Sequence, residues 1–113
     1  MLEPEFSSML ALGFRILTEG PQQVLICRSA DGVLHQVSLL HIRQGEHQEE
    51  AALLRELEGM TVTHIIALWD DATLDLPSAY FRRELAAFCP DSQAALVLLQ
   101  TGSGQLPLPL NAF

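Results

Sequence analysis

Two apolar segments decide the fold of this chain: VTHIIALW at residues 62–69 and AALVLL at residues 94–99. Such continuous apolar runs are typical of strands that are covered on both faces of a sheet. Between them, Phe81, Leu85 and Phe88 follow the i, i+4, i+7 spacing of a helix. A strand, a helix and a second strand form a right-handed crossover, which places the two strands side by side and parallel.

The elements before this unit are predicted from shorter patterns. Pro4 and the spacing of the apolar residues after it predict a helix over residues 4–12 that ends at Gly13. Acidic residues followed by a leucine stripe predict a second helix over residues 46–58. Between these helices, turn sequences separate three β-like runs that we expect to form an antiparallel meander, the third run flanked by its partners: residues 14–18, 23–28 and 33–42.

Together these elements predict a single α+β domain with a mixed sheet, in the order α-β-β-β-α-β-α-β. A length of 113 residues fits one domain. We assign that domain to residues 1–104 and an extended tail, rich in proline and leucine, to residues 105–113. The tail is expected to pack on the domain or on a partner through its apolar residues, which are Leu106, Leu108, Leu110 and Phe113.

The composition is acidic, with 14 Asp and Glu residues against 6 basic ones, and the net charge is -8. This balance disfavours nucleic acid and anionic membranes as partners. Cys27 and Cys89 are far apart and lack the spacing of metal ligands, so they predict neither a disulfide nor a zinc site. Because the sequence shows no signal-like or membrane-spanning segment, we expect a cytoplasmic protein without a cofactor.

Three carboxylates follow the first central strand: Asp70, Asp71 and Asp75. Open sheets bind ligands at the carboxyl ends of such strands, so these residues are candidates for holding a divalent cation. As an alternative, Asp70 and Asp71 are turn residues and Asp75 caps the helix that starts near Pro77. We favour the structural roles and expect no tight metal binding.

The chain has four histidines, His35, His41, His47 and His64. His35 and His41 share one face of a strand but lie about 20 Å apart, too far to bind the same metal ion. His64 or His41 would complete a metal site with the strand-end carboxylates, and a structural role is the alternative for each histidine.

No motif for nucleophilic or phosphate chemistry is present. The sequence lacks a GxSxG elbow, and the absence of lysine excludes a P-loop. Arg82 and Arg83, followed by Glu84, form either a charged patch for a partner or an ordinary solvated surface.

The predicted order of helices and strands resembles the core of restriction-endonuclease-like folds, including the Mrr-type branch. Members that cut nucleic acid carry an acid-x-Lys on the third strand, whereas this chain has VLHQVSL at residues 33–39. The resemblance therefore implies a non-catalytic member. In size and charge the chain is also similar to the acidic secretion chaperones of bacteria, which act as homodimers.

The leading hypothesis from the sequence is a non-enzymatic protein-protein interaction domain or accessory subunit that forms a homo-oligomer, with the homodimer as the simplest form. It depends on the absence of catalytic motifs and on the apolar tail. The alternatives are a metal-assisted enzyme with an acidic site at Asp70 and Asp71, or a catalytically degenerate member of a nuclease-like fold.

Overall fold

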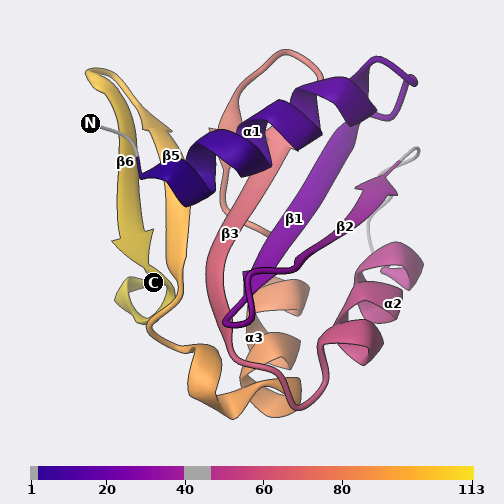
Figure 1. Cartoon of the computed structure of the whole chain (residues 1–113), viewed down its shortest axis with the longest axis vertical. Helices are drawn as coiled ribbons and strands as arrows, with labels where there is room; N and C mark the ends of the chain where they lie inside the picture. The colour runs from indigo at the N-terminus through magenta and orange to yellow at the C-terminus, as the bar shows by residue number, and fades with distance from the viewer. Residues whose placement is uncertain (1–2, 40–46) are drawn as a thin grey trace.

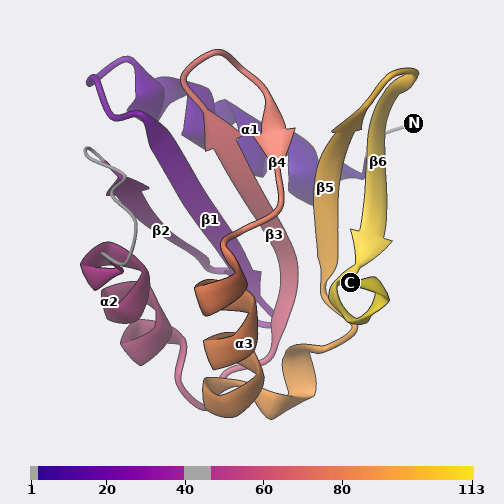
Figure 2. The same cartoon turned by 180° about the vertical axis from the view of Figure 1, so that it is seen from behind.

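The computed structural model describes residues 3–39 and 47–113 and consists of three layers. One helix, α1 (Pro4–Leu17), crosses one face of a six-stranded sheet (Figure 1). Two helices, α2 (Gln48–Leu57) and α3 (Ala79–Phe88), cover the opposite face (Figure 2). The sheet is therefore shielded from solvent on both sides.

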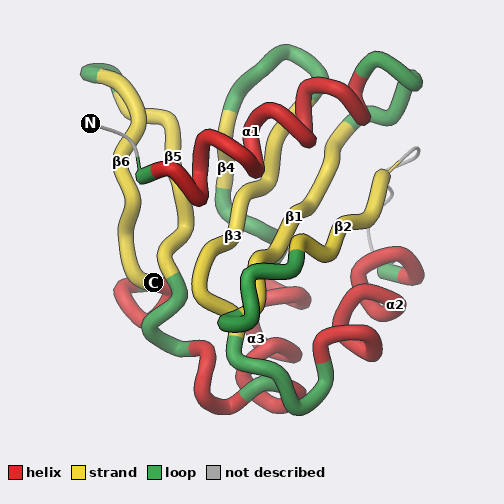
Figure 3. The backbone as a smooth tube through the Cα atoms, viewed as in Figure 1, coloured by secondary structure: helices red, strands yellow, loops and turns green. Residues whose placement is uncertain are grey.

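The sheet is mixed and has the strand order β2-β1-β3-β5-β6, with the short β4 paired to β3 (Figure 3). Short 3-10 helices follow α3 and β6, as η1 (Pro90–Ser92) and η2 (Leu110–Ala112). The strands are β1 (Gln23–Ser29), β2 (Leu34–Leu39), β3 (Val62–Trp69), β4 (Leu74–Asp75), β5 (Leu96–Thr101) and β6 (Gly104–Pro109).

The predicted crossover is confirmed. β3 and β5 are parallel neighbours, with His64 opposite Leu96 and Ile65 opposite Val97. α3 lies between these strands in the chain. The α+β class and the mixed sheet are confirmed with it, because every other strand pair in the sheet is antiparallel.

The predicted strand at residues 14–18 is wrong, because α1 continues to Leu17. Gly13 does not end this helix. A Cβ atom at Gly13 would lie 2.9 Å from Cδ2 of Leu68, so the glycine lets the helix approach β3 closely. The buried residues of α1 keep helical spacing through this point: Phe6, Met9, Gly13 and Ile16.

Without a strand at 14–18, the three-stranded meander is reduced to the hairpin of β1 and β2. β2 lies at the edge of the sheet and pairs with β1, so the predicted position between two partners is also wrong. The predicted element order changes accordingly, because β4 and β6 are additional strands. Residues 40–46, which include the predicted end of the third run and the predicted start of the second helix, lie outside the described residues.

Alternation along β3 divides the core between the two faces. Ile65 and Ala67 pack with α2 and α3, whereas Ile66 and Leu68 pack with α1. By the same alternation His64 faces α1, and its ring packs edge-on against Phe6 at 4.9 Å between ring centroids.

The proline-rich tail is part of the sheet in this structure. β6 pairs antiparallel with β5, and Leu108 lies opposite Val97. Leu110 is buried in the core on the side of α2 and α3, whereas Leu106 and Phe113 are about half exposed. None of the described helices is long and apolar enough to cross a membrane.

Candidate functional site

The first turns of α2 and α3 meet on one face of the sheet, and a hydrogen-bonded network joins them. Ser78 is the N-cap of α3, because its Oγ accepts a hydrogen bond from the backbone N–H of Phe81 at 3.1 Å. The hydroxyl of Ser78 donates to Oε2 of Glu50 at 2.5 Å. The prediction that Asp75 caps this helix is wrong, since Asp75 lies in β4 and accepts from the backbone N–H of Leu76 at 2.8 Å.

Glu50 is the centre of this junction. It is only 6% exposed, although it carries a carboxylate, and burial of an unpaired carboxylate is very unfavourable. Each of its oxygens has a partner: Ser78 on Oε2, and Nδ1 of His47 on Oε1 at 2.8 Å. The carboxylate also lies near the positive ends of two helix dipoles, which attract a negative charge.

A stacked aromatic pair lies beside the network. The rings of His47 and Tyr80 are 4.2 Å apart and nearly parallel, with an interplanar angle of 10°. The guanidinium carbon of Arg83 lies 6.0 Å from the centroid of the Tyr80 ring. Glu49, in the first turn of α2, is exposed to solvent. The junction therefore combines partly exposed aromatic surface with an exposed carboxylate.

Among the described residues, the strand-end carboxylates do not converge on a histidine. Oδ1 of Asp71 accepts from the hydroxyl of Thr73 at 2.6 Å and from its backbone N–H at 3.0 Å. These two hydrogen bonds lower the pKa of Asp71 below its usual range. Asp70 donates its backbone N–H to the carbonyl of Gln22 at 2.9 Å. The structure therefore gives Asp71 a turn role and brings no second carboxylate to it among the described residues.

The histidines occupy separate places. His35 is buried in β2, where Nδ1 lies 2.7 Å from Oε1 of Glu56 and Nε2 lies 3.2 Å from Oγ of Ser29. His41 lies outside the described residues. His64 lies near Glu3 and Glu5, and not near Asp70 or Asp71. No local sequence pattern predicts this grouping, because α1 and β3 are far apart along the chain.

The two cysteines are free and buried. Burial raises the pKa of the Cys27 thiol, and Cys89 adds to the rise. Burial also raises the pKa of Cys89, whose Sγ donates to the carbonyl of Leu57 at 3.0 Å. A thiol with a raised pKa is a poor nucleophile and a poor metal ligand at neutral pH. Neither cysteine takes part in the helix junction.

A surface pocket of about 400 Å³ lies along α3, η1 and η2. Its polar lining includes Arg82, Arg83, Gln93 and Asn111. Arg82 donates through Nη1 to the carbonyl of Pro77. The guanidinium of Arg82 is thus partly used in holding the start of α3.

The fold is similar to that of two solved enzymes. The crystal structure of the cytidine deaminase from Bacillus anthracis matches with a TM-score of 0.72 over 97% of this chain and 86% of that chain, at 15% sequence identity. The cytidine deaminase from Mycobacterium leprae matches with a TM-score of 0.64 over 93% of this chain and 94% of that chain, at 10% identity. At these identities the likeness shows the fold alone. No protein-family model matches the chain, and no curated protein matches it.

These findings overturn the leading hypothesis from the sequence. A non-enzymatic protein-protein interaction domain or accessory subunit is wrong, because the chain has the deaminase-like fold of an enzyme class. The resemblances to restriction-endonuclease-like folds and to secretion chaperones are replaced by this likeness, while the α+β class remains correct.

Zinc deaminases bind their metal with a signature of the form H-x-E followed by P-C-x-x-C, in which the histidine and both cysteines are ligands and the glutamate is the general acid or base. This chain has His47-Gln-Glu49 at the start of α2. At the start of α3 it has Pro77-Ser-Ala-Tyr-Phe81, so serine and phenylalanine stand at the cysteine positions. Phe81 is fully buried in the core and cannot bind a metal. The helix junction therefore does not fit the zinc ion of these enzymes.

The predictions from sequence also missed the helix junction. A zinc signature is recognised by its cysteines, and here they are replaced. What remains of the signature is His47-x-Glu49 at the start of α2 and Pro77 just before α3. That pair is short and has no distinctive composition.

Proposed function

We propose that this protein binds a pyrimidine nucleoside or its free base, with a preference for cytosine, at the junction of α2 and α3, and that it does so without a zinc ion. The observation that carries the proposal is the junction itself: the first turn of α2 presents an exposed carboxylate, Glu49, and the N-cap residue of the same helix, His47, stacks on Tyr80. The likeness to cytidine deaminases supports the choice of ligand class.

The chemistry of the ligand fits these groups. A carboxylate accepts a hydrogen bond from the exocyclic amine of cytosine, whereas the carbonyl oxygen at the same position of uracil would face it as a second acceptor. A base also stacks on aromatic side chains, with a contribution of about 1–3 kcal/mol per base. In this proposal Glu49 gives specificity, and the pair of His47 and Tyr80 gives most of the affinity.

Zinc-dependent deamination is not part of the proposal. Zinc-dependent deamination uses a water molecule bound to the metal, so it needs the full set of metal ligands. Of the three ligand positions in the zinc signature, only that of His47 carries a metal-binding residue in this chain. We propose that the protein works in the cytoplasm. Both cysteines are free, as is usual for proteins of a reducing compartment.

Calorimetry with cytidine, cytosine and uridine tests the proposal. We expect saturable binding in which cytidine is preferred to uridine by roughly 5- to 150-fold, the range that one good polar contact to a base edge provides. Glu49→Gln should remove this preference, and Tyr80→Ala should weaken both ligands alike. Glu58→Gln, an exposed glutamate at the other end of α2, is the matched control and should change neither.

An assay for ammonia release, run with and without added zinc, completes the test. We expect added zinc to leave the rate of ammonia release unchanged, because the zinc ligand set is incomplete. Zinc-dependent deamination that is lost in Glu49→Gln would show that the metal chemistry persists, and the absence of binding by any of the three ligands would exclude the proposed ligand class.

A further inference from the structure

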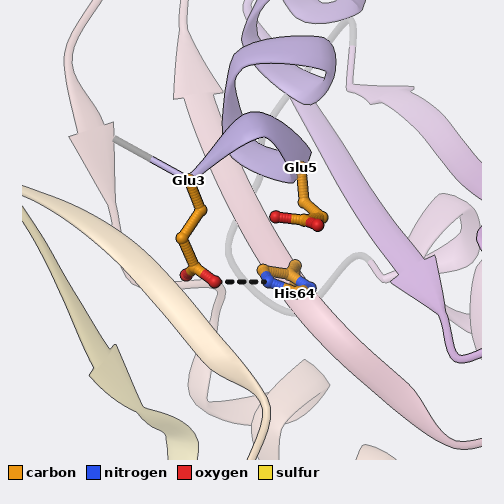
Figure 4. Close-up of side chains that lie close together, drawn as sticks. All are labelled: Glu3, Glu5 and His64. Carbon is orange, nitrogen blue, oxygen red and sulfur yellow. Dashed lines mark ion pairs between the residues drawn. The ribbon is translucent and has the colours of Figure 1, made fainter. Parts of the chain in front are cut away.

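Three metal-ligating side chains converge on the opposite face of the sheet from the helix junction. Glu3 and Glu5 extend from the first turn of α1 towards His64 on β3 (Figure 4). One ligand atom from each residue lies within 4.8 Å of the other two. Nε2 of His64 lies 3.8 Å from Oε1 of Glu3, which is longer than a hydrogen bond.

The packing of α1 holds this group in place. Glu3 is the N-cap residue of the helix, and Pro4 occupies its first position. Phe6, one residue after Glu5, is fully buried and packs edge-on against the imidazole ring. The ring of His64 is thereby fixed, whereas Glu3 keeps 45% of its side chain exposed and is free to adjust.

The hydrogen bonds around Thr63 define which nitrogen of His64 carries the proton. Oγ1 of Thr63 donates to the carbonyl of Arg28 at 3.2 Å and accepts from Nη1 of Arg28 at 3.0 Å. With its hydrogen directed to the carbonyl of Arg28, Thr63 accepts from Nδ1 of His64 in their contact of 2.8 Å. In a neutral imidazole, Nε2 then has a lone pair and no hydrogen.

Nε2 of His64 is buried and has no hydrogen-bond partner, and the residue as a whole is 9% exposed. It lies with two carboxylates, which also only accept hydrogen bonds. Three acceptors that face one another in a partly buried place favour a positively charged partner between them. A bound cation is such a partner.

The distances suit a cation after a small adjustment. An ion at about 2.1 Å from two ligand atoms holds them at most about 4.2 Å apart, so the pair of His64 and Glu3 already fits. The widest pair has to close by at most about 0.6 Å, which small rotations of the exposed Glu3 and partly exposed Glu5 side chains provide. A surface pocket of about 250 Å³ is lined in part by Glu5 and Arg28.

From this geometry we propose that Glu3, Glu5 and His64 bind a divalent transition-metal ion, such as Zn²⁺ or Mn²⁺, with water in the remaining coordination positions. One imidazole nitrogen with two carboxylate oxygens favours these ions over Mg²⁺ and Ca²⁺, which prefer oxygen ligands alone. Two carboxylates balance the charge of the ion, while the positive end of the α1 dipole and the nearby guanidinium of Arg28 oppose its binding.

Calorimetry on the untagged full chain at pH 7 tests the site, with zinc and manganese as the probes. We expect one saturable zinc site. His64→Gln and Glu5→Gln should each lower the zinc affinity about tenfold or more. Glu19→Gln makes the same change of charge at an exposed position outside the group and should leave the affinity unchanged. Circular dichroism of the metal-free variants shows whether each is folded. If His64→Gln does not fold, the zinc affinity of Glu5→Gln tests the site.

Two further readouts locate the ion and complete the test. Cobalt bound at this site should show a d–d spectrum without a sulfur charge-transfer band, because no cysteine is near the group. Equal zinc affinity in all the variants, or no saturable binding, would overturn the proposal. So would an NMR spectrum in which His64 carries protons on both nitrogens at pH 7 and does not change when zinc is added.

Discussion

Glu50→Ala is the substitution that most directly tests the network at the helix junction. The carboxylate accepts two charge-assisted hydrogen bonds, from Ser78 at 2.5 Å and from His47 at 2.8 Å. Bonds of this kind contribute about 1.5–3 kcal/mol each. Relief of the desolvated charge offsets part of that loss. We therefore expect the free energy of unfolding to fall by about 2–4 kcal/mol.

Urea denaturation at pH 7 measures the effect, and the single tryptophan, Trp69, provides a fluorescence signal from the central strand β3. The midpoint should fall while the m-value stays constant, because the surface exposed on unfolding is unchanged. Glu49→Ala is the matched control, since it removes an exposed glutamate from the same turn; its cost should stay within about 0.5 kcal/mol.

A double-mutant cycle with Ser78→Ala separates the contact from the N-cap. Ser78→Ala alone should cost about 1 kcal/mol as a lost cap, in addition to its bond with Glu50. We expect a coupling energy between the two positions of about 1–3 kcal/mol. If Glu50→Ala were as stable as Glu49→Ala, or if the coupling were zero, the network would not hold the two helices together.

Two further predictions concern stability elsewhere in the fold. Gly13→Ala should lower the free energy of unfolding by about 1–2 kcal/mol in the same urea assay. Overpacking against Leu68 costs about 1–3 kcal/mol, whereas the gain in helix propensity is at most about 1 kcal/mol. A stabilised variant would refute the close contact. Asp31 accepts hydrogen bonds from the Ser29 hydroxyl and the Val33 N–H, and these bonds lower its pKa. Asp31→Asn should therefore lower the melting temperature above about pH 4, and the loss should shrink as the pH falls below that value. Thermal melts across pH measure this, and a loss of melting temperature that is the same at every pH would refute it.

The sequence predicted the elements that are specified by local patterns. The continuous apolar runs of β3 and β5 predicted central parallel strands, because only burial on both faces explains them. It failed at residues 14–18, where Gly13 resembles a helix end but is a packing position against Leu68. That role depends on a contact between residues that are far apart in the chain, which a local pattern does not contain.

The candidate sites were missed for a related reason. Glu3 and His64 are separated by most of the first half of the chain, and only the crossing of α1 over β3 brings them together. His64 was considered with Asp70 and Asp71 because they follow the same strand. In the structure, alternation along β3 and the contact with Phe6 fix His64 on the face of α1.

If the helix junction works without zinc, as we propose, its own residues must hold the two helices together. Two helix N-termini that converge need a negative charge and partners for their free N–H groups. Here Glu50 provides the charge, and Ser78 provides both the cap and the link to it. Ser78, which links the helices, and the buried Phe81 stand at the two cysteine positions of the zinc signature, so the residues that stabilise this junction are also the ones that support our proposal of binding without zinc.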